Sequence, residues 1–217
     1  MGPLLSSASP GAGLVPQDLV HRWKRGLLTE ERPVLEFYKH KTGDHRCFSN
    51  FFEHVDVVFE VPEAFCARPL DETRRRVRCT FSVKAIMLCK AAAMGDLARF
   101  DAIAESTSPG DAKCLGRGIW PFDQDLWNRL VLPVAYEVVL QKFAQLPDLQ
   151  EILLSTGDRA LAEMTSADSI WGTGVDVGSE EAADASKWPG TNILGWALME
   201  ARVSLRGSAQ KQQAGAS

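Results

Sequence analysis

The sequence changes its pattern at Ser82, and this change limits the possible folds more than any other feature. Before Ser82, three β-like runs alternate with polar loops, at Val34 to Tyr38, Val55 to Val61 and Arg76 to Phe81. From Ser82 onward the sequence favours helices, which we expect at 83–95, 96–106, 109–116, 123–145, 147–155 and 192–205. Strands followed by a block of helices are typical of α+β domains. We therefore predict an α+β fold, a predominantly helical single domain with a small, mainly antiparallel sheet.

Side chains that can cap a helix stand where several of these helices should begin. Ser82 and Ser108 are the expected N-caps of two of them, since a serine oxygen can accept a hydrogen bond from a free N–H of the first turn. Pro109 follows Ser108, and proline suits the first helical position because that position needs no N–H donor. Asp96 should begin the helix that lies between them.

The two ends of the chain lack the apolar periodicity that holds a fold together. Residues 1–16 are rich in Ser, Ala, Gly and Pro, and residues 207–217 in Gly, Ser, Ala and Gln. We predict that both segments are disordered and that residues 17–206 form one catalytic domain. A chain of 217 residues is long enough for one domain with a sizeable core.

Charge and cysteine content exclude several classes of protein. The net charge of −4 argues against a protein that coats nucleic acid by bulk charge, although a local basic groove stays possible. The five cysteines include no C-x-x-C pair and the four histidines no H-x-x-x-H pair, so we expect no metal site and no cofactor. No signal peptide or long apolar run is present, and we expect reduced thiols, no membrane contact and a cytoplasmic or nuclear monomer.

The last third of the chain combines carboxylates, tryptophans and glycines. The runs are Leu153 to Asp158, Glu163 to Gly172 and Trp188 to Arg202. An acidic residue beside an indole can bind a sugar or a base and support acid–base chemistry, because its surroundings tune the carboxyl pKa. The alternative is that these are packing and turn residues.

The order of several short motifs resembles the NADAR family, which includes the YbiA-like N-glycosidases. The resemblance spans about residues 34–206. It is carried by Phe37-Tyr38, Phe48-Ser49-Asn50-Phe51, Ser82 to Lys90, Leu115-Gly116-Arg117, Asp125-Leu126-Trp127, Lys142-Phe143, Leu153 to Asp158, Asp168 to Gly172, Asn192 to Gly195, Leu198-Met199 and Arg202. It implies a YbiA-like fold and hydrolysis of an N-glycosidic bond at a ribose without a metal. Substrates of the family are riboflavin-pathway phosphoribosyl intermediates and ADP-ribose attached to guanine.

Two candidate catalytic residues follow from this resemblance and from their own chemistry. Lys90 lies seven residues after position 83, so both share one helix stripe about 10 Å apart. Lys90 could neutralise a phosphate or attack a ribose aldehyde as a Schiff-base amine, or it could be a solvated surface lysine. Asp168 could accept hydrogen bonds from ribose hydroxyls or stabilise an oxocarbenium-like transition state, or it could cap a turn.

The expected substrate-binding residues come from several parts of the sequence. Trp127 offers a stacking face for a base, unless it packs in the core. Lys113 and Arg117 lie four residues apart on one helical face and are candidate phosphate contacts, although exposed basic pairs are usually solvated. The resemblance adds the loop residues Phe48, Ser49 and Asn50, together with Trp171, Gly172 and Asn192.

One position departs from the family. Where the resemblance implies a catalytic glutamate, this chain has Val83, which can neither take nor give a proton. Valine is unremarkable in the first turn of a helix, so local structure does not explain the change. Either the chain is a non-hydrolysing homologue or the substitution stands in an otherwise active protein. Loss of acid–base help would lower the rate about 10²–10⁴-fold.

We therefore predict an N-glycosidase that removes ADP-ribose from guanine bases of nucleic acid or nucleosides, impaired by Val83. One alternative substrate is a riboflavin-pathway ribosylamine, and one alternative function is ADP-ribose binding without cleavage. The arginines of the run Arg74-Arg75-Arg76-Val77-Arg78 slightly favour a polyphosphate or nucleic-acid substrate. A charged edge strand would carry the same residues.

Overall fold

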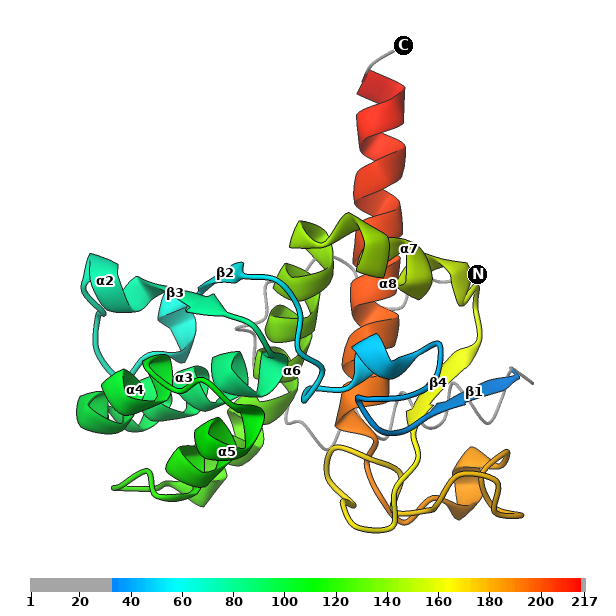
Figure 1. Cartoon of the computed structure of the whole chain (residues 1–217), viewed down its shortest axis with the longest axis horizontal. Coiled ribbons are helices and arrows are strands. Elements are labelled where there is room, and N and C mark those ends of the chain that lie inside the picture. Colours follow the sequence, from blue (N-terminus) through cyan, green and yellow to red (C-terminus); the bar gives the residue numbers. More distant parts are fainter. Residues whose placement is uncertain (1–32, 216–217) are drawn as a thin grey trace.

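The computed structural model describes residues 33–215, with side chains up to residue 208. Figure 1 shows α6 (Gln124–Gln145) between two groups of elements, with α8 (Ile193–Gly215) packed along it. On one side lie β2 (Val57–Glu60), α2 (Glu72–Arg75), β3 (Arg76–Cys79), α3 (Ser82–Met94), α4 (Leu97–Ala104) and α5 (Pro109–Arg117). On the other side lie β1 (Val34–Phe37), α7 (Pro147–Ser155) and β4 (Ala160–Glu163), and 3₁₀ turns occur at Arg46–Phe48, Glu63–Phe65 and Ala185–Lys187. The α+β, mostly helical single domain is confirmed.

The helix starts agree with the sequence at two of the three expected positions. The Asp96 and Ser108 side chains accept hydrogen bonds from first-turn N–H groups of α4 and α5. Ser82 is not an N-cap, because the extended Phe81 holds that position and its side chain makes no cap bond. The N–H of Val83 instead donates to the Asn50 carbonyl oxygen at 3.0 Å, so a distant loop does part of what a cap would do.

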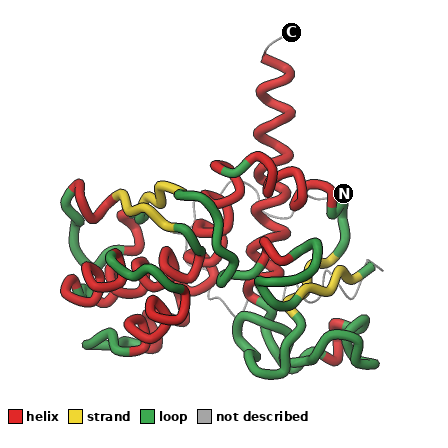
Figure 2. Tube along the Cα trace, viewed as in Figure 1, coloured by secondary structure: helices red, strands yellow, loops and turns green. Residues whose placement is uncertain are grey.

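The strands form two separate pairs and not one sheet. β2 pairs antiparallel with β3, as expected, but β1 pairs parallel with β4, in the register Val34 to Ala160 and Phe37 to Glu163. The expectation of one mainly antiparallel sheet is therefore wrong in this detail. β4 has only four residues and shows no alternation of polar and apolar residues, because its first three are all buried. Loops fill much of the region around this pair in Figure 2.

Helix α8 continues beyond the boundary that the sequence suggests. It runs to Gly215 and projects from the body of the molecule, ten residues past the expected end at 205, while disorder of residues 207–217 stays a prediction. Alanine, glutamine and lysine favour helix, and extending an existing helix costs little because its nucleus is already formed. Residues 1–16, also predicted to be disordered, lie outside the described residues.

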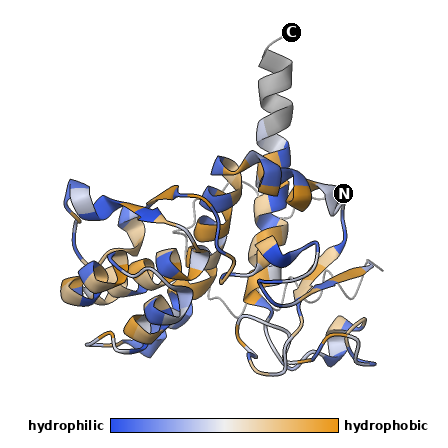
Figure 3. Ribbon diagram, viewed as in Figure 1, coloured by the Kyte–Doolittle hydropathy of each residue, from blue (hydrophilic) through white to orange (hydrophobic). Residues whose placement is uncertain are grey.

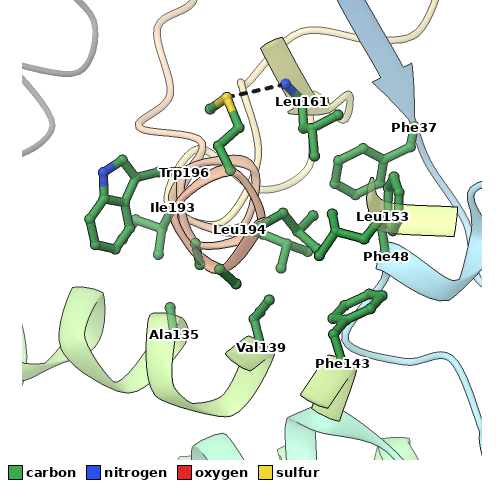
Figure 4. Close-up of a cluster of buried hydrophobic side chains, with 14 of the residues drawn as sticks. Phe37, Phe48, Ala135, Val139, Phe143, Leu153, Leu161, Ile193, Leu194 and Trp196 are labelled. Atoms are coloured by element: carbon green, nitrogen blue, oxygen red, sulfur yellow. Dashed lines mark hydrogen bonds between the residues drawn. The ribbon is translucent and has the colours of Figure 1, made fainter. Parts of the chain in front are cut away.

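Two hydrophobic clusters meet at α6. The face of α6 toward α8 carries Ala135, Val139 and Phe143, which pack with Leu161 and Leu194 (Figure 4). Its opposite face carries Val134 and Val138, which pack with apolar residues of α3, β2 and β3. In Figure 3 the short helix α2, at the outer edge, is hydrophilic. Because α6 contributes to both clusters, it fixes the two groups of elements relative to each other.

Within residues 33–215, no helix joins the length and the apolar character that a bilayer span needs. In the same stretch, no three His, Cys, Asp or Glu side chains gather closely enough to hold a metal ion.

Candidate functional site

The site is built around Glu163, the last residue of β4. Its backbone N–H donates to Asn192 Oδ1 at 3.0 Å, and its carbonyl oxygen accepts from the N–H of Thr173 at 2.9 Å. These bonds fix the residue between the start of α8 and the loop after Trp171. Glu163 thus stands at the carboxyl end of a parallel strand pair, an edge at which functional side chains often gather.

The surroundings of Glu163 tune its carboxyl group for proton transfer. Burial and, to a smaller extent, the negative charge of Asp168 raise its pKa to about 7, against the opposing positive charge of Lys113. At neutral pH the group is therefore divided between its acid and base forms, which suits a general acid or base. Two carboxyl groups in unlike environments are a common arrangement for such chemistry.

Asp168 performs the structural role that the sequence left open. Its Oδ1 accepts from the N–H groups of Ile170 at 3.0 Å and Trp171 at 2.9 Å, so it caps the turn that carries the indole. It remains half-buried and acts on Glu163 through its charge. Gly172 supports the same turn, because a Cβ there would lie 2.8 Å from the Glu163 carbonyl oxygen and 2.9 Å from that of Asp168. A side chain at position 172 would therefore not fit without a shift of the backbone.

Lys113 connects Glu163 to the start of α3. Its Nζ lies 5.2 Å from the centre of the Phe51 ring, and Phe51 packs against the small cluster of Phe81, Val83 and Ala112. Lys113 is half-buried, whereas Arg117, one turn later on α5, is exposed. Lys113 therefore acts on Glu163 through its charge and lies against Phe51, which packs on the cluster that contains Val83.

Packing explains the valine at position 83. Its side chain is only 4% exposed and belongs to an apolar cluster, so a hydrocarbon fits this place without an unsatisfied charge. The expectation that local structure does not explain this residue is wrong. A carboxylate there would need a basic partner, and Lys113, which lies over the Phe51 ring beside this cluster, is a candidate.

Lys90 is not a solvated surface lysine. Its Nζ donates to the Gly116 carbonyl oxygen at 3.0 Å and lies 4.4 Å from the centre of the Phe122 ring and 5.9 Å from that of Trp127. Burial lowers its pKa, which favours the neutral, nucleophilic amine. Trp127 and Trp171 are half-buried, and each packs against both large clusters, so core packing accounts for part of each side chain.

Two predicted substrate contacts belong to the core instead. Phe48 is 1% exposed, with its ring against those of Phe37 and Phe143. Asn192 is fully buried, and its Nδ2 donates to the Leu161 carbonyl oxygen at 3.0 Å while its Oδ1 holds the Glu163 N–H. Neither side chain reaches solvent in this structure, so their burial gives no support to a direct substrate contact, which stays a prediction. Asn192 is a positioning residue for Glu163.

The loop residues Ser49 and Asn50 are also largely buried, at 5% and 8% exposed. Ser49 Oγ accepts from the N–H of Phe51 at 3.2 Å, and the Asn50 carbonyl oxygen holds the start of α3. The buried Lys142 stabilises this loop, because its Nζ donates to the Cys47 carbonyl oxygen at 2.6 Å. Burial lowers the pKa of Lys142 to about 8.

The arginine run before α3 is occupied by surface ion pairs. Arg74 bonds Asp71 and Asp101, Arg75 lies 3.3 Å from Glu60, and Arg78 lies 3.2 Å from Asp56. The run therefore has the features of a charged strand edge, and it does not support the expectation of a polyphosphate or nucleic-acid contact at this place.

Comparison with known proteins decides the family. The model of the NADAR domain matches residues 36–206, nearly the whole described part of the chain. The chain belongs to the NADAR domain family. A solution structure of Escherichia coli YbiA matches this NADAR domain with a TM-score of 0.61 at 23% identity, covering 82% of this chain and 88% of that one. The YbiA-like fold is confirmed.

Three relatives of this NADAR domain are informative. Protein irg-1 of Caenorhabditis elegans is 31% identical over 167 residues, which cover 73% of this chain and 74% of that protein. N-glycosidase R617 of Acanthamoeba polyphaga mimivirus is 35% identical over 54% of this chain and 69% of its own length. N-glycosidase Npun_R5314 of Nostoc punctiforme is 32% identical over 51% of this chain and 64% of its own length.

Proposed function

We propose that this NADAR domain is an N-glycosidase that releases ADP-ribose from guanine bases of nucleic acid or nucleosides, at a rate reduced by Val83. The observation that carries the proposal is the half-buried Glu163 carboxyl, whose pKa is raised to about 7 under the opposing charges of Asp168 and Lys113. N-glycosidase activity in the relatives from mimivirus and Nostoc supports the reaction class.

The arrangement supplies each proton that the reaction needs. Glu163 in its acid form gives a proton to the leaving base as the bond between ribose C1′ and the base nitrogen breaks, and the bonding electrons remain with the base. The charge of Asp168 stabilises the oxocarbenium-like ribose. Water then adds to C1′ and returns a proton to Glu163. Glu163 must serve as both acid and base, because Val83 cannot deprotonate that water, and this makes the last step slow.

The substrate is proposed from the remaining side chains around Glu163. Lys113 and Arg117 lie one turn apart on α5 and suit the diphosphate of ADP-ribose. The half-buried faces of Trp127 and Trp171 suit a planar base. Lys90, which is half-buried and has a lowered pKa, would contact the ribose or a phosphate.

Chromatography of ADP-ribose released from ADP-ribosylated guanosine tests the proposal. Glu163→Gln should lower kcat/KM by about 100-fold or more, because glutamine cannot deliver a proton. The wild-type rate should fall as pH rises through about 7, where Glu163 loses its proton. Glu200→Gln is the matched control, because burial also raises the pKa of Glu200 but that residue lies within α8. Equal rates for wild type and Glu163→Gln would refute the assignment.

A second function, ADP-ribose binding without cleavage, is favoured by the apolar packing of Val83. In that case calorimetry would detect ADP-ribose binding while chromatography detected no release from any substrate. A riboflavin-pathway ribosylamine in the same assays separates the two substrate classes. We expect it to bind more weakly than ADP-ribose, because it offers one phosphate to Lys113 and Arg117 in place of two.

A further inference from the structure

The loop between α5 and α6 carries an aromatic side chain that the fold does not need for packing. Trp120 is 80% exposed, more than any other large hydrophobic side chain that the structure describes. Phe122, two residues later, is 36% exposed. Exposed tryptophan is costly to keep in water, and an indole offers a broad face for stacking.

Side-chain contacts fix this loop at both ends. The N–H of Trp120 donates to Asp96 Oδ2 at 2.9 Å, while Asp96 Oδ1 caps α4. The N–H of Asp123 approaches Met94 Sδ at 3.2 Å. The indole is therefore presented by backbone that is already ordered, so a ligand that stacks on it loses little conformational entropy.

Positive side chains lie beside this loop. The Phe122 ring lies against Lys90, whose Nζ is 4.4 Å from the ring centre. The Arg99 guanidinium lies directly below the loop, because a Cβ on Gly118 would be 3.0 Å from its Nη2. Arg117 is exposed at the end of α5. Aromatic faces interleaved with positive charge are the features with which proteins bind single-stranded nucleic acid.

We propose that Trp120 and Phe122 form a stacking surface for bases of single-stranded nucleic acid that flank the modified guanine, with Arg99 and Arg117 beside the phosphates. This inference rests on the proposed function and names a polynucleotide as its substrate. Phe122 lies against Lys90, the residue proposed above for the ribose or a phosphate. Flanking bases would bind here while the modified guanosine contacts Lys90.

Fluorescence anisotropy with a labelled oligodeoxythymidylate of about 10 nucleotides tests the surface without any need for turnover. At low salt Trp120→Ala should weaken binding about tenfold, and Trp120→Phe should keep most of the affinity because a ring remains. Val203→Ala is the matched control, because Val203 is a 58% exposed apolar residue on α8 and should bind as wild type. Unchanged melting temperatures would show that each variant is folded.

Equal affinities of wild type and Trp120→Ala, or no binding by the wild type, would overturn the stacking surface. A change of oligomeric state in Trp120→Ala without loss of oligonucleotide affinity would overturn it as well, since Trp120 would then contact protein. Release of ADP-ribose from free ADP-ribosylated guanosine by the wild type reports on the proposed function separately. Oligonucleotide binding that depends on Trp120, without that release, would support the surface and count against the glycosidase.

Discussion

The start of α3 and the end of β4 are fastened alike but carry opposite chemistry. In each, a backbone N–H is held by a distant asparagine, that of Val83 by the Asn50 carbonyl and that of Glu163 by the Asn192 side chain. Val83 lies in an apolar cluster, whereas Glu163 is a half-buried carboxyl with a pKa of about 7. A fixed backbone therefore does not determine the chemistry of a site. Here the group that we propose for proton transfer is at the end of β4.

The largest effect should come from placing a carboxylate at the other position. Val83→Glu should raise kcat/KM for release of ADP-ribose by about 100-fold or more, because a second carboxylate can deprotonate the attacking water. Lys113, which contacts the same cluster through Phe51, can balance the new charge. Initial rates by chromatography measure the change.

Val83→Gln is the control for this variant, because it has nearly the same shape but cannot transfer a proton. We expect Val83→Gln to remain at the wild-type rate. Its melting temperature should fall about as much as that of Val83→Glu, because both place a polar group in an apolar cluster. Equal rates in all three proteins would mean that position 83 does not face the reacting ribose.

The second prediction concerns the fastening at the end of β4. Asn192→Ala removes two buried hydrogen bonds, those to the Glu163 N–H and the Leu161 carbonyl, and should lower the free energy of unfolding by about 2–4 kcal/mol. Asn192→Asp keeps the acceptor and loses the donor, so its loss should be intermediate. Denaturant titration measures both. A stable Asn192→Ala protein with full turnover would contradict the positioning role.

The third prediction concerns Lys142, whose Nζ donates to the Cys47 carbonyl oxygen in the loop before α3. Lys142 is 3% exposed, and burial lowers its pKa from 10.5 to about 8. Below pH 8 the folded protein holds a buried ammonium. As pH rises from 8 to 10.5 the folded state loses this proton before the unfolded state does, so stability relative to Lys142→Met should rise by on the order of 3 kcal/mol.

Denaturant titrations of both proteins at pH 7 and at about pH 10 test this difference. Lys142→Arg is the control, because guanidinium keeps its charge throughout this range. A stability difference between wild type and Lys142→Met that does not vary with pH would show that Lys142 titrates normally and is better solvated than its burial indicates.

The sequence predicts what local chemistry determines. β2, β3 and the caps Asp96 and Ser108 depend on neighbouring residues, and they are found where expected. β4 could not be predicted, because Ala-Leu-Ala-Glu has no alternation and becomes a strand only beside β1. The position of Asp168 in the sequence allows either a turn cap or a ribose contact, and the structure shows the cap.

The site was predicted less completely than the fold, for a related reason. A motif identifies recurring residues but not whether they touch a ligand, so Phe48 and Asn192 were assigned to the substrate although both are buried. Glu163 was overlooked because its raised pKa comes from burial and from Asp168 and Lys113, which are brought together only by the fold. An apolar run that ends in a carboxylate, five residues before Asp168, was the available signal.

The smallest effect should come from the arginine run that leads into α3. Arg74→Ala removes ion pairs with Asp71 and Asp101, all three at the surface, so turnover of ADP-ribosylated guanosine and binding of ADP-ribose should change less than about twofold. Lys113→Ala, measured beside it, should weaken ADP-ribose binding, because Lys113 is the proposed diphosphate contact and its charge acts on Glu163. If instead Arg74→Ala impaired binding as strongly as Lys113→Ala, the arginine run would belong to the substrate site. The start of α3 would then contribute charge to recognition even though Val83 contributes none to catalysis.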